Sequence, residues 1–393
     1  MAQVFRAAAR GHALVRFRFR RMFSSEPARV LIIQLAHMGD GLMLTPVLKA
    51  LRREHPHLKV SLLLNSYTAP FFKSQTQLEL EHVWELDTIK FRKPGFDASA
   101  QTQDQPWEDQ WFDAVVLVRY SPRLLPYVLI GKYGRAVFYD YGTYPLRKGW
   151  MGLLTGTPVH SSARGVQNNV ALVAAALATA GYPLRDLGHI SVFSSDAELR
   201  RVSDWLAEAD IQSAGYLVLA PGAPFPYRQW PAERYAELFG RVLATNPALK
   251  IFLIGAAHES ALHQAIMTQL DPRIAGCVRS VAGEFSWGEL AAFISQARVL
   301  VGTDGGLVHL ASATSTPVIA LYGPQMPEIF GPWQPAPGSR VLHKRRFCSP
   351  CWQRGCVSPQ HYCMMDISVD EVEDALRAIL SKLDAVAKTV EEY

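Results

Sequence analysis

The chain has 393 residues, of which 49% are hydrophobic and 19% are charged. This is about twice the usual length of a domain and enough apolar content for two cores, so two domains are favoured over one large one. The formal charge of +5 suits anionic ligands or an anionic membrane surface. It is too small to indicate nucleic acid, and we expect no nucleic-acid partner.

The first 27 residues form a basic extension. Six arginines and no acidic residue precede Glu26, and apolar side chains such as Phe17 and Phe19 lie between the arginines. Such a segment can rest on anionic headgroups while its apolar side chains enter the membrane interface. A disordered tail, or a start codon assigned too early, explains the same pattern equally well.

Targeting and membrane signals are weak in this sequence. The arginines interrupt any apolar core of a secretory signal, although an Arg-rich, acid-poor start imitates an organellar transit peptide. No stretch reaches the roughly 20 apolar residues of a membrane span. The longest candidate, Val170 to Ala180, is better explained as a buried helix. We therefore expect a cytoplasmic protein whose membrane contact is peripheral.

From Val30 onward, β-branched runs alternate with helical patterns, which is typical of parallel sheets covered by helices. The first series of predicted strands comprises residues 30–35, 59–65, 82–86, 113–119 and 135–139. The second series comprises residues 216–220, 251–255, 277–281, 299–302 and 317–322. The prediction is an α/β protein with two Rossmann-like domains.

The domain boundaries follow from composition. We predict the basic extension at 1–27, a first Rossmann-like domain at 28–185, a linker at 186–213, a second Rossmann-like domain at 214–345, and a Cys-rich segment with a C-terminal helix at 346–393. Residues 92–110 are polar and Gln-rich, which indicates a surface excursion of the first domain.

Ligands of open α/β sheets bind beyond the carboxyl ends of the strands, where helix N-termini present unpaired N–H groups. The segment from His37 to Gly41 directly follows the first predicted strand and places Asp40 at or near a helix start. Its carboxylate can accept a proton, and the flanking Gly39 and Gly41 allow a ligand to approach closely. Alternatively, Asp40 only caps the helix, and His37 is a rival base.

In the second half, the segment from Pro221 to Pro231 follows a strand and precedes a helix that Pro231 begins. The small-residue turn at Gly222 and Ala223 can hold a diphosphate with backbone N–H groups, and Arg228 can add a bidentate contact. The alternative is a proline-rich loop with a solvated arginine.

A later turn carries Asp304, Gly305 and Gly306. The two glycines leave their N–H groups unshielded for a phosphate. Asp304 would repel a diphosphate at close range, so we expect it to bind sugar hydroxyls or to order the loop. His309, on the following helix, is either a ligand or a core residue.

Glu259 follows another strand end and can accept hydrogen bonds from ribose hydroxyls, or it only favours the helix dipole. No two aspartates of the chain are separated by a single residue. The carboxylate pair that commonly holds a metal against a nucleotide diphosphate is therefore missing, and we expect chemistry that requires no metal cofactor.

Four of the five cysteines lie close together in the sequence, at Cys348, Cys351, Cys356 and Cys363. A CxxC followed by two more thiols resembles a structural zinc site. Buried thiols or a redox-active pair are the alternatives, because the spacings are not those of the best-known zinc ribbons.

The order of these segments resembles glycosyltransferase family 9, the ADP-heptose:lipopolysaccharide heptosyltransferases, over nearly all of residues 28 to 385. The similar segments are MGD after the first strand, PGA before WP, GAAHE, TDGGLVHLA with ALYGP, and CSPCWQRGC through YCM. The late cysteine run is most similar to members that add a second or later heptose.

The resemblance implies a GT-B architecture of two facing Rossmann-like domains, an ADP-heptose donor in the C-terminal domain and a lipid-linked saccharide acceptor in the N-terminal one. It implies that Asp40 is the general base of an inverting transfer, and that Glu259 contacts the ribose. Phe285 and Ser286 would contact the adenine. It also implies work at the cytoplasmic face of an inner membrane.

Two residues depart from the family pattern, because Arg228 replaces a frequent Lys and Gly305 replaces a frequent Ser or Thr. The missing hydroxyl leaves the identity of the donor open. The alternatives are transfer from a different nucleotide sugar to another surface polysaccharide, and non-catalytic binding of a nucleotide sugar. A nicotinamide-dependent oxidoreductase is disfavoured because the first strand does not lead into a GxGxxG turn.

Overall fold

The computed structural model describes residues 26–86, 110–118, 132–140, 159–161, 169–211, 215–349, 351, 356–358 and 362–391. The chain divides into two compact units, Met1–Gly188 (unit 1) and His189–Tyr393 (unit 2). The division falls near the start of the predicted linker, 186–213. Most of the predicted basic extension and of the predicted excursion at 92–110 lies outside the described residues.

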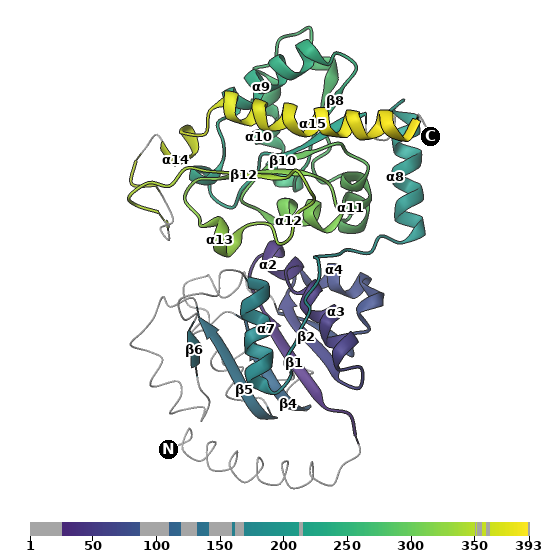
Figure 1. Ribbon diagram of the computed structural model, residues 1–393, viewed down its shortest axis with the longest axis vertical. Helices are drawn as coiled ribbons and strands as arrows, with labels where there is room; N and C mark the ends of the chain where they lie inside the picture. The colour runs from purple at the N-terminus through teal and green to yellow at the C-terminus, as the bar shows by residue number, and fades with distance from the viewer. Residues whose placement is uncertain are drawn as a thin grey trace. The chain divides into compact units, whose positions relative to one another are not determined.

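Unit 1 contains a parallel sheet with the strand order β3-β2-β1-β4-β5-β6 (Figure 1). Its strands are β1 (Arg29–Gln34), β2 (Lys59–Asn65), β3 (His82–Leu86), β4 (Trp111–Leu117), β5 (Lys132–Asp140) and β6 (Val159–Ser161). Its helices are α2 (Met38–Leu42), α3 (Thr45–Glu54), α4 (Ala69–Ser74), the 3-10 helix η1 (Thr76–Leu78) and α7 (Asn169–Ala180). Helices α3 and α7 contact each other, and α7 also covers β4 and β5.

Unit 2 contains a second parallel sheet with the order β12-β11-β10-β7-β8-β9. Its strands are β7 (Tyr216–Ala220), β8 (Lys250–Leu253), β9 (Val278–Ser280), β10 (Leu300–Thr303), β11 (Val318–Tyr322) and β12 (Arg340–His343). The α-helices are α8 (Asp196–Glu208), α9 (Ala232–Thr245), α10 (Ser260–Met267), α11 (Trp287–Ser295), α12 (Gly306–Ala313), α13 (Pro327–Phe330), α14 (Tyr362–Met365) and α15 (Val369–Glu391). Short 3-10 helices are η6 (Pro226–Arg228), η7 (Ala257–Glu259) and η8 (Ala275–Cys277).

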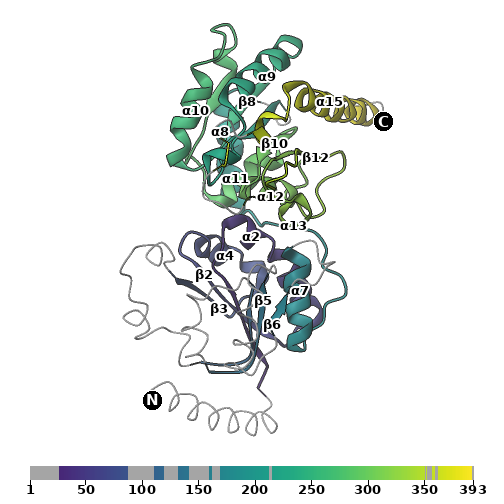
Figure 2. The ribbon, with the colours of Figure 1, turned by 90° about the vertical axis from the view of Figure 1, so that its left-hand side faces the viewer.

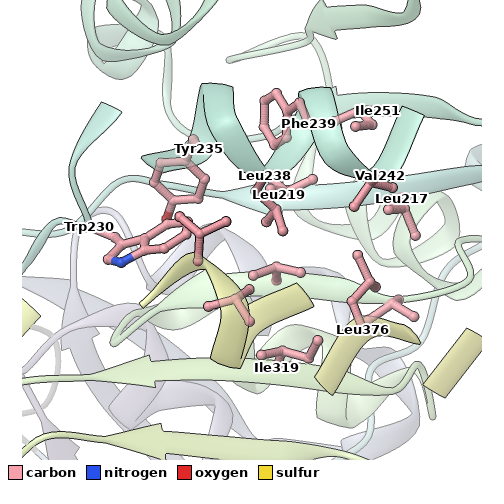
Figure 3. Close-up of a cluster of buried hydrophobic side chains, with 14 of the residues drawn as sticks. Leu217, Leu219, Trp230, Tyr235, Leu238, Phe239, Val242, Ile251, Ile319 and Leu376 are labelled. Carbon is pink, nitrogen blue, oxygen red and sulfur yellow. The ribbon is translucent and has the colours of Figure 1, made fainter. Parts of the chain in front are cut away.

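The core of unit 2 follows from the period of two along its strands. Leu217 and Leu219 point to one face, where they pack with Tyr235 of α9 and Leu376 of α15 (Figure 3). Tyr216, which precedes Leu217, points to the other face and stacks on Phe293 of α11 with ring centroids 4.9 Å apart. Both faces of the sheet are therefore covered, which is the arrangement that all-parallel sheets require.

Trp230 helps to attach the last helix, α15, to this unit. The Trp230 indole N–H donates to the Ile367 carbonyl at 2.9 Å, just before α15 begins. Helix α15 then contacts α9, β11 and β12, and Figure 2 shows it foreshortened below α9. None of the helices within the described ranges combines the length and the apolar character needed to cross a bilayer.

Both sheets reverse direction in their strand order at one point. The chain leaves β1 toward β2 and β3, and then returns to place β4 on the other side of β1; β7 and β10 have the same relation in unit 2. In such sheets the crevice at the carboxyl ends of these two central strands is where ligands bind. The carboxyl ends of β1, β7 and β10 are therefore where functional residues should be sought.

Candidate active site at the strand tips

The turn after β7 is held to the turn after β10. Thr303 ends β10, is buried, and donates its hydroxyl hydrogen to the Gly222 carbonyl oxygen at 2.6 Å. Since β7 and β10 are paired in register, this bond continues their contact beyond the last strand residues. Gly222 and Ala223 therefore occupy a fixed turn at the point where the strand order reverses, and binding of a diphosphate there stays a prediction.

Arg228, at the end of η6, is largely enclosed. Its side chain is 17% exposed, its Nη1 lies 3.5 Å from Asp304 Oδ2, and its guanidinium lies over the Phe225 ring at 5.2 Å from the centroid. The Arg228 Nε is buried without a hydrogen-bond partner among the described residues. The alternative of a solvated arginine is therefore wrong, because the guanidinium is enclosed by Phe225 and Asp304.

Asp304 orders the loop after β10, which is one of the two roles expected for it. Besides Arg228, its carboxylate interacts with Tyr322 at the end of β11. Burial, together with the negative charge of Asp304, raises the pKa of the Tyr322 hydroxyl well above its usual value. The protonated hydroxyl donates to the Phe330 carbonyl at 2.8 Å, so Tyr322 links the tips of β10 and β11 to α13.

Glu259 is half-buried and folds inward across two glycines. Its Oε2 accepts the Ala256 N–H at 2.8 Å. A Cβ atom added at either Gly222 or Gly255 would collide with the Glu259 carboxylate. The carboxylate therefore fills the space between the tips of β7 and β8, beside the predicted phosphate turn.

Helix α12 begins at Gly306 with Gly305 as its N-cap, directly after Asp304, and the N-cap contributes no side-chain hydrogen bond. A side chain at Gly305 would meet nothing closer than the Thr303 carbonyl oxygen at 3.6 Å. The hydroxyl that the family often has at this position would therefore fit, and its absence is not forced by packing.

His309 lies on α12 and is 5% exposed. Burial lowers its pKa to about 4, so the imidazole is neutral near pH 7. Its Nδ1 is buried and has no hydrogen-bond partner among the described residues. Of the two roles left open by the sequence, the burial favours the core residue, and the unpaired nitrogen leaves room for a ligand contact.

Phe285 and Ser286 have structural roles. The Phe285 ring stacks on Phe293 at 4.9 Å and meets Trp205 edge-on at 5.4 Å. Ser286 is the N-cap of α11: its Oγ accepts the Glu289 N–H at 3.2 Å, and Glu289 Oε2 accepts the Ser286 N–H at 2.7 Å. This reciprocal pair satisfies two N–H groups of the helix start. Contact of these residues with adenine stays a prediction.

In unit 1, Asp40 is the third residue of α2. The N-cap is His37, so Asp40 is not itself the cap; instead its Oδ2 accepts the His37 N–H at 3.2 Å. The preceding Ala36 carbonyl accepts hydrogen bonds from the side chains of Asn65 and Tyr67 near the tip of β2. These bonds fix the turn, while the half-buried Asp40 carboxylate lies on a helix that directly follows β1.

The glycines beside Asp40 are both buried. A Cβ atom at Gly41 would stand 2.8 Å from Thr68 Cγ2 and 3.4 Å from Phe72 Cε2, so α2 packs closely on the segment that starts α4. Gly41 is therefore required for packing, and a role of Gly39 or Gly41 toward an acceptor stays a prediction.

The four clustered cysteines are free thiols; Cys351 and Cys363 are buried. Burial, together with the nearby Cys356 and Cys348, raises the pKa of Cys363 to about 11. Cys356 and Cys348 therefore each lie within electrostatic reach of Cys363. Even so, no group of three or more His, Cys, Asp or Glu side chains in the described part of the chain is arranged to hold a metal ion.

Unit 1 and unit 2 each contain a hollow. An open depression of about 510 Å³ in unit 1 is lined in part by Arg52, Lys59 and Glu79, at the amino end of β2 and so away from the ligand-binding edge. A smaller pocket of about 210 Å³ lies beside η6 and is lined by residues that include Trp230 and Met364.

Three further residues contribute to these strand tips without having been predicted from the sequence. Thr303 and Tyr322 lie inside segments that the sequence pattern singles out, but no role was predicted for them. His263, in α10, was not singled out at all, although it lies one helical turn after Glu259.

The model of the family described as Glycosyltransferase family 9 (heptosyltransferase) matches residues 153–361. Lipopolysaccharide heptosyltransferase 2 of Salmonella typhimurium is 28% identical over 163 residues, which cover 41% of this chain and 46% of that protein. The aligned part thus spans about half the length of this curated relative.

Solved structures show the same fold. A glycosyltransferase of family 9 from Veillonella parvula has a TM-score of 0.69 at 17% identity and covers 91% of this chain and 99% of its own. The E. coli heptosyltransferase WaaC, solved with ADP, has a TM-score of 0.62 at 20% identity and covers 89% and 99%. The predicted architecture, two parallel α/β sheets of the GT-B kind, is confirmed.

Proposed function

Because the chain is a member of glycosyltransferase family 9, the heptosyltransferase family, we propose that it transfers heptose from ADP-heptose to the inner core of a lipopolysaccharide. The observation that carries this proposal is the linked pair of turns after β7 and β10, with the enclosed Arg228 beside the N-terminus of α12. Backbone N–H groups and an arginine can hold a pyrophosphate without a metal ion.

In the proposed donor complex, unit 2 binds the nucleotide sugar. The N–H groups of Gly222, Ala223 and Gly306, together with Arg228, meet the pyrophosphate, and Glu259 accepts hydrogen bonds from the ribose. The remaining predicted donor residues serve the adenine and the sugar: Phe285, Ser286, Asp304, Gly305 and His309. The solved complex of WaaC with ADP supports a nucleotide of this kind.

The proposed reaction is an inverting displacement. The Asp40 carboxylate takes the proton of an acceptor hydroxyl as its oxygen attacks the anomeric carbon. The new carbon–oxygen bond forms as the bond between the anomeric carbon and the diphosphate oxygen breaks, and ADP leaves with that electron pair. Arg228 and the N–H groups stabilise the negative charge that develops on the diphosphate. No metal ion is required in this scheme.

The test is turnover with ADP-heptose and a truncated lipopolysaccharide core acceptor, measured as ADP released. Wild-type protein should release ADP only when both substrates are present. A panel of nucleotide sugars in a thermal-shift screen tests the donor separately, because a bound donor stabilises the fold in proportion to its affinity. Stabilisation by a different nucleotide sugar alone would replace the ADP-heptose proposal, and tight binding without turnover on any acceptor would indicate a non-catalytic binder.

The acceptor is lipid-linked in this proposal, so the protein would work at the cytoplasmic face of an inner membrane. The excess of basic residues, +5 in formal charge, supports contact with anionic headgroups. Sedimentation with vesicles of anionic and of neutral lipid would measure that contact, and equal binding to both kinds of vesicle would contradict it.

We also propose a structural zinc ion bound by Cys348, Cys351, Cys356 and Cys363. The electrostatic coupling of Cys363 to Cys348 and Cys356 supports it, although the four do not form a ready ligand set among the described residues. Metal binding would have to draw the thiols together and deprotonate them. Less than one equivalent of zinc in purified protein, with all thiols titrating freely, would remove this proposal.

A further inference from the structure

His263 is a completely buried histidine beside the proposed nucleotide site. It lies on α10, four residues after Glu259, so both side chains emerge on the same side of the chain near the helix start. The side chain is 0% exposed, and its Nδ1 lies 2.7 Å from Ser280 Oγ at the end of β9. Its Nε2 is buried and has no hydrogen-bond partner among the described residues.

The bond to Ser280 fixes which nitrogen carries the hydrogen. Ser280 Oγ already accepts the Ala282 N–H at 3.5 Å, and His263 Nδ1 is the one acceptor in the described part of the chain that the hydroxyl hydrogen reaches. The Ser280 hydroxyl therefore donates to Nδ1, and the hydrogen of the neutral ring is on Nε2. Burial also lowers the pKa of His263 to about 4, which keeps the ring neutral near pH 7.

His263 Nε2 and the Glu259 carboxylate both lie close to Gly255. A Cβ atom at Gly255 would stand 3.4 Å from His263 Nε2, and the same position would collide with Glu259 Oε2. The nitrogen and the carboxylate oxygen thus flank one small space at the tip of β8. A buried N–H without an acceptor costs free energy, so a change that gives it an acceptor is favourable.

We propose that His263 is a positioning residue for ribose recognition: its Nε2–H holds the inner face of the Glu259 carboxylate while the outer face accepts the ribose hydroxyls. This inference rests on the proposed nucleotide-sugar site. The acceptor for the buried N–H is supplied when Glu259 moves to meet the ribose, so binding of the nucleotide completes the hydrogen bonding of His263. Ser280 acts one step further back, because it fixes the tautomer.

The experiment compares the dissociation constants of ADP and 2′-deoxy-ADP by calorimetry at pH 7.5. Wild-type protein should bind ADP more tightly than the deoxy form. His263→Leu should bind ADP about tenfold more weakly and lose most of the preference for the ribose. His263→Gln should restore both, because its amide N–H₂ can take the place of Nε2–H. In a Glu259→Gln background, His263→Leu should have little further effect, since the group that it positions is altered.

A core truncation in α9, Val242→Ala, is the control for lost stability, because Val242 is buried far along the helix from the strand tips. It should lower the melting temperature and leave the ratio of the two dissociation constants unchanged. A wild-type ratio in His263→Leu would overturn the inference. If that variant does not fold, Ser280→Ala decides, with a reduced ratio expected and an unchanged ratio overturning it. If wild-type protein binds no ADP, the proposed function fails instead.

Discussion

In unit 2, the turns after β7, β8 and β10 contact one another through side chains, whereas the turn after β1 in unit 1 is held mainly through the Ala36 carbonyl. Thr303 bonds to Gly222, Arg228 pairs with Asp304, and the Glu259 carboxylate lies over two glycines. In unit 1, the chemistry predicted for the described residues after β1 is that of a single base, Asp40 or its rival His37.

This difference predicts how each unit would respond to the loss of a side chain that contacts the nucleotide sugar or the acceptor. The interlocked turns of unit 2 are largely formed before any ligand arrives, so little ordering is needed on binding, and several groups share the attraction for the nucleotide. Removal of one of these groups should therefore weaken nucleotide binding without abolishing it. A general base, by contrast, is one group with one function, and its removal should abolish turnover with little effect on binding in unit 2.

The largest effect is expected from Asp40→Asn. The amide cannot take a proton, so kcat should fall by about a thousandfold, while the ADP dissociation constant stays within about twofold because unit 2 is unchanged. ADP release and calorimetry measure the two quantities. His37→Gln is the neighbouring control and should keep most of the activity; if it loses as much as Asp40→Asn, the base is His37.

The next effect is expected from Arg228→Ala. It removes a charged donor and leaves the 12% exposed Asp304 carboxylate without this counter-ion, so the KM for the donor should rise about a hundredfold. Kinetics with varied donor concentration test this. Arg228→Lys should lose far less, because the charge remains. Arg228→Ala combined with Asp304→Asn should recover part of the loss, and no recovery would show that Asp304 does not repel the donor.

A smaller effect is expected on the stability of unit 2 as the pH falls. Burial lowers the pKa of His309 to about 4 from an ordinary 6.5, so between these values the unfolded chain binds the proton and the folded chain does not. The contribution of His309 to the free energy of unfolding should be fully present above pH 6.5 and fall as the pH drops, by roughly 2 kcal/mol at pH 5. Burial also lowers the pKa of His263 to about 4, and its separate contribution should be the same in wild-type protein and in the His309 variant. Urea unfolding at both pH values, compared with His309→Gln, measures it. The same pH dependence in the variant would contradict the assignment.

The smallest effect is expected from Ser286→Ala. Loss of an N-cap typically costs about 1 kcal/mol, and the melting temperature should fall accordingly, with the donor KM nearly unchanged if Ser286 only caps α11. A rise of the KM for the donor beyond about threefold, which exceeds what such a loss in a distant helix explains, would instead support the predicted contact with adenine.

The strands of both sheets could be predicted because buried parallel strands are short β-branched runs with turns at their ends. Predicted and observed bounds differ by three residues at most; for example, β10 starts at Leu300 instead of Val299. The edge strands β6 and β12 were not predicted. They are three and four residues long, and β12 is half-exposed, so neither shows an apolar run. Helix α9 begins at Ala232, with Pro231 as its cap.

The candidate site was predicted only in part. Positions directly after a strand, such as Gly222 and Asp304, could be found because the topology gathers strand ends at one edge. The direction of a side chain could not, because the Glu259 carboxylate is placed by glycines from two strands. One missed signal was available: Ser286 and Glu289 have the S-x-x-E spacing of a capping box, which the structure also shows at Ser195 and Glu198.

The Glu259 carboxylate occupies the volume that side chains at Gly222 and Gly255 would need. For anyone who redesigns the nucleotide preference, these three positions are one unit of variation. A library that changes Gly222 or Gly255 singly will mostly sample collisions, whereas shortening Glu259 at the same time opens room for new side chains at both. Substitutions here should be strongly non-additive, so they have to be recombined together and not selected one at a time.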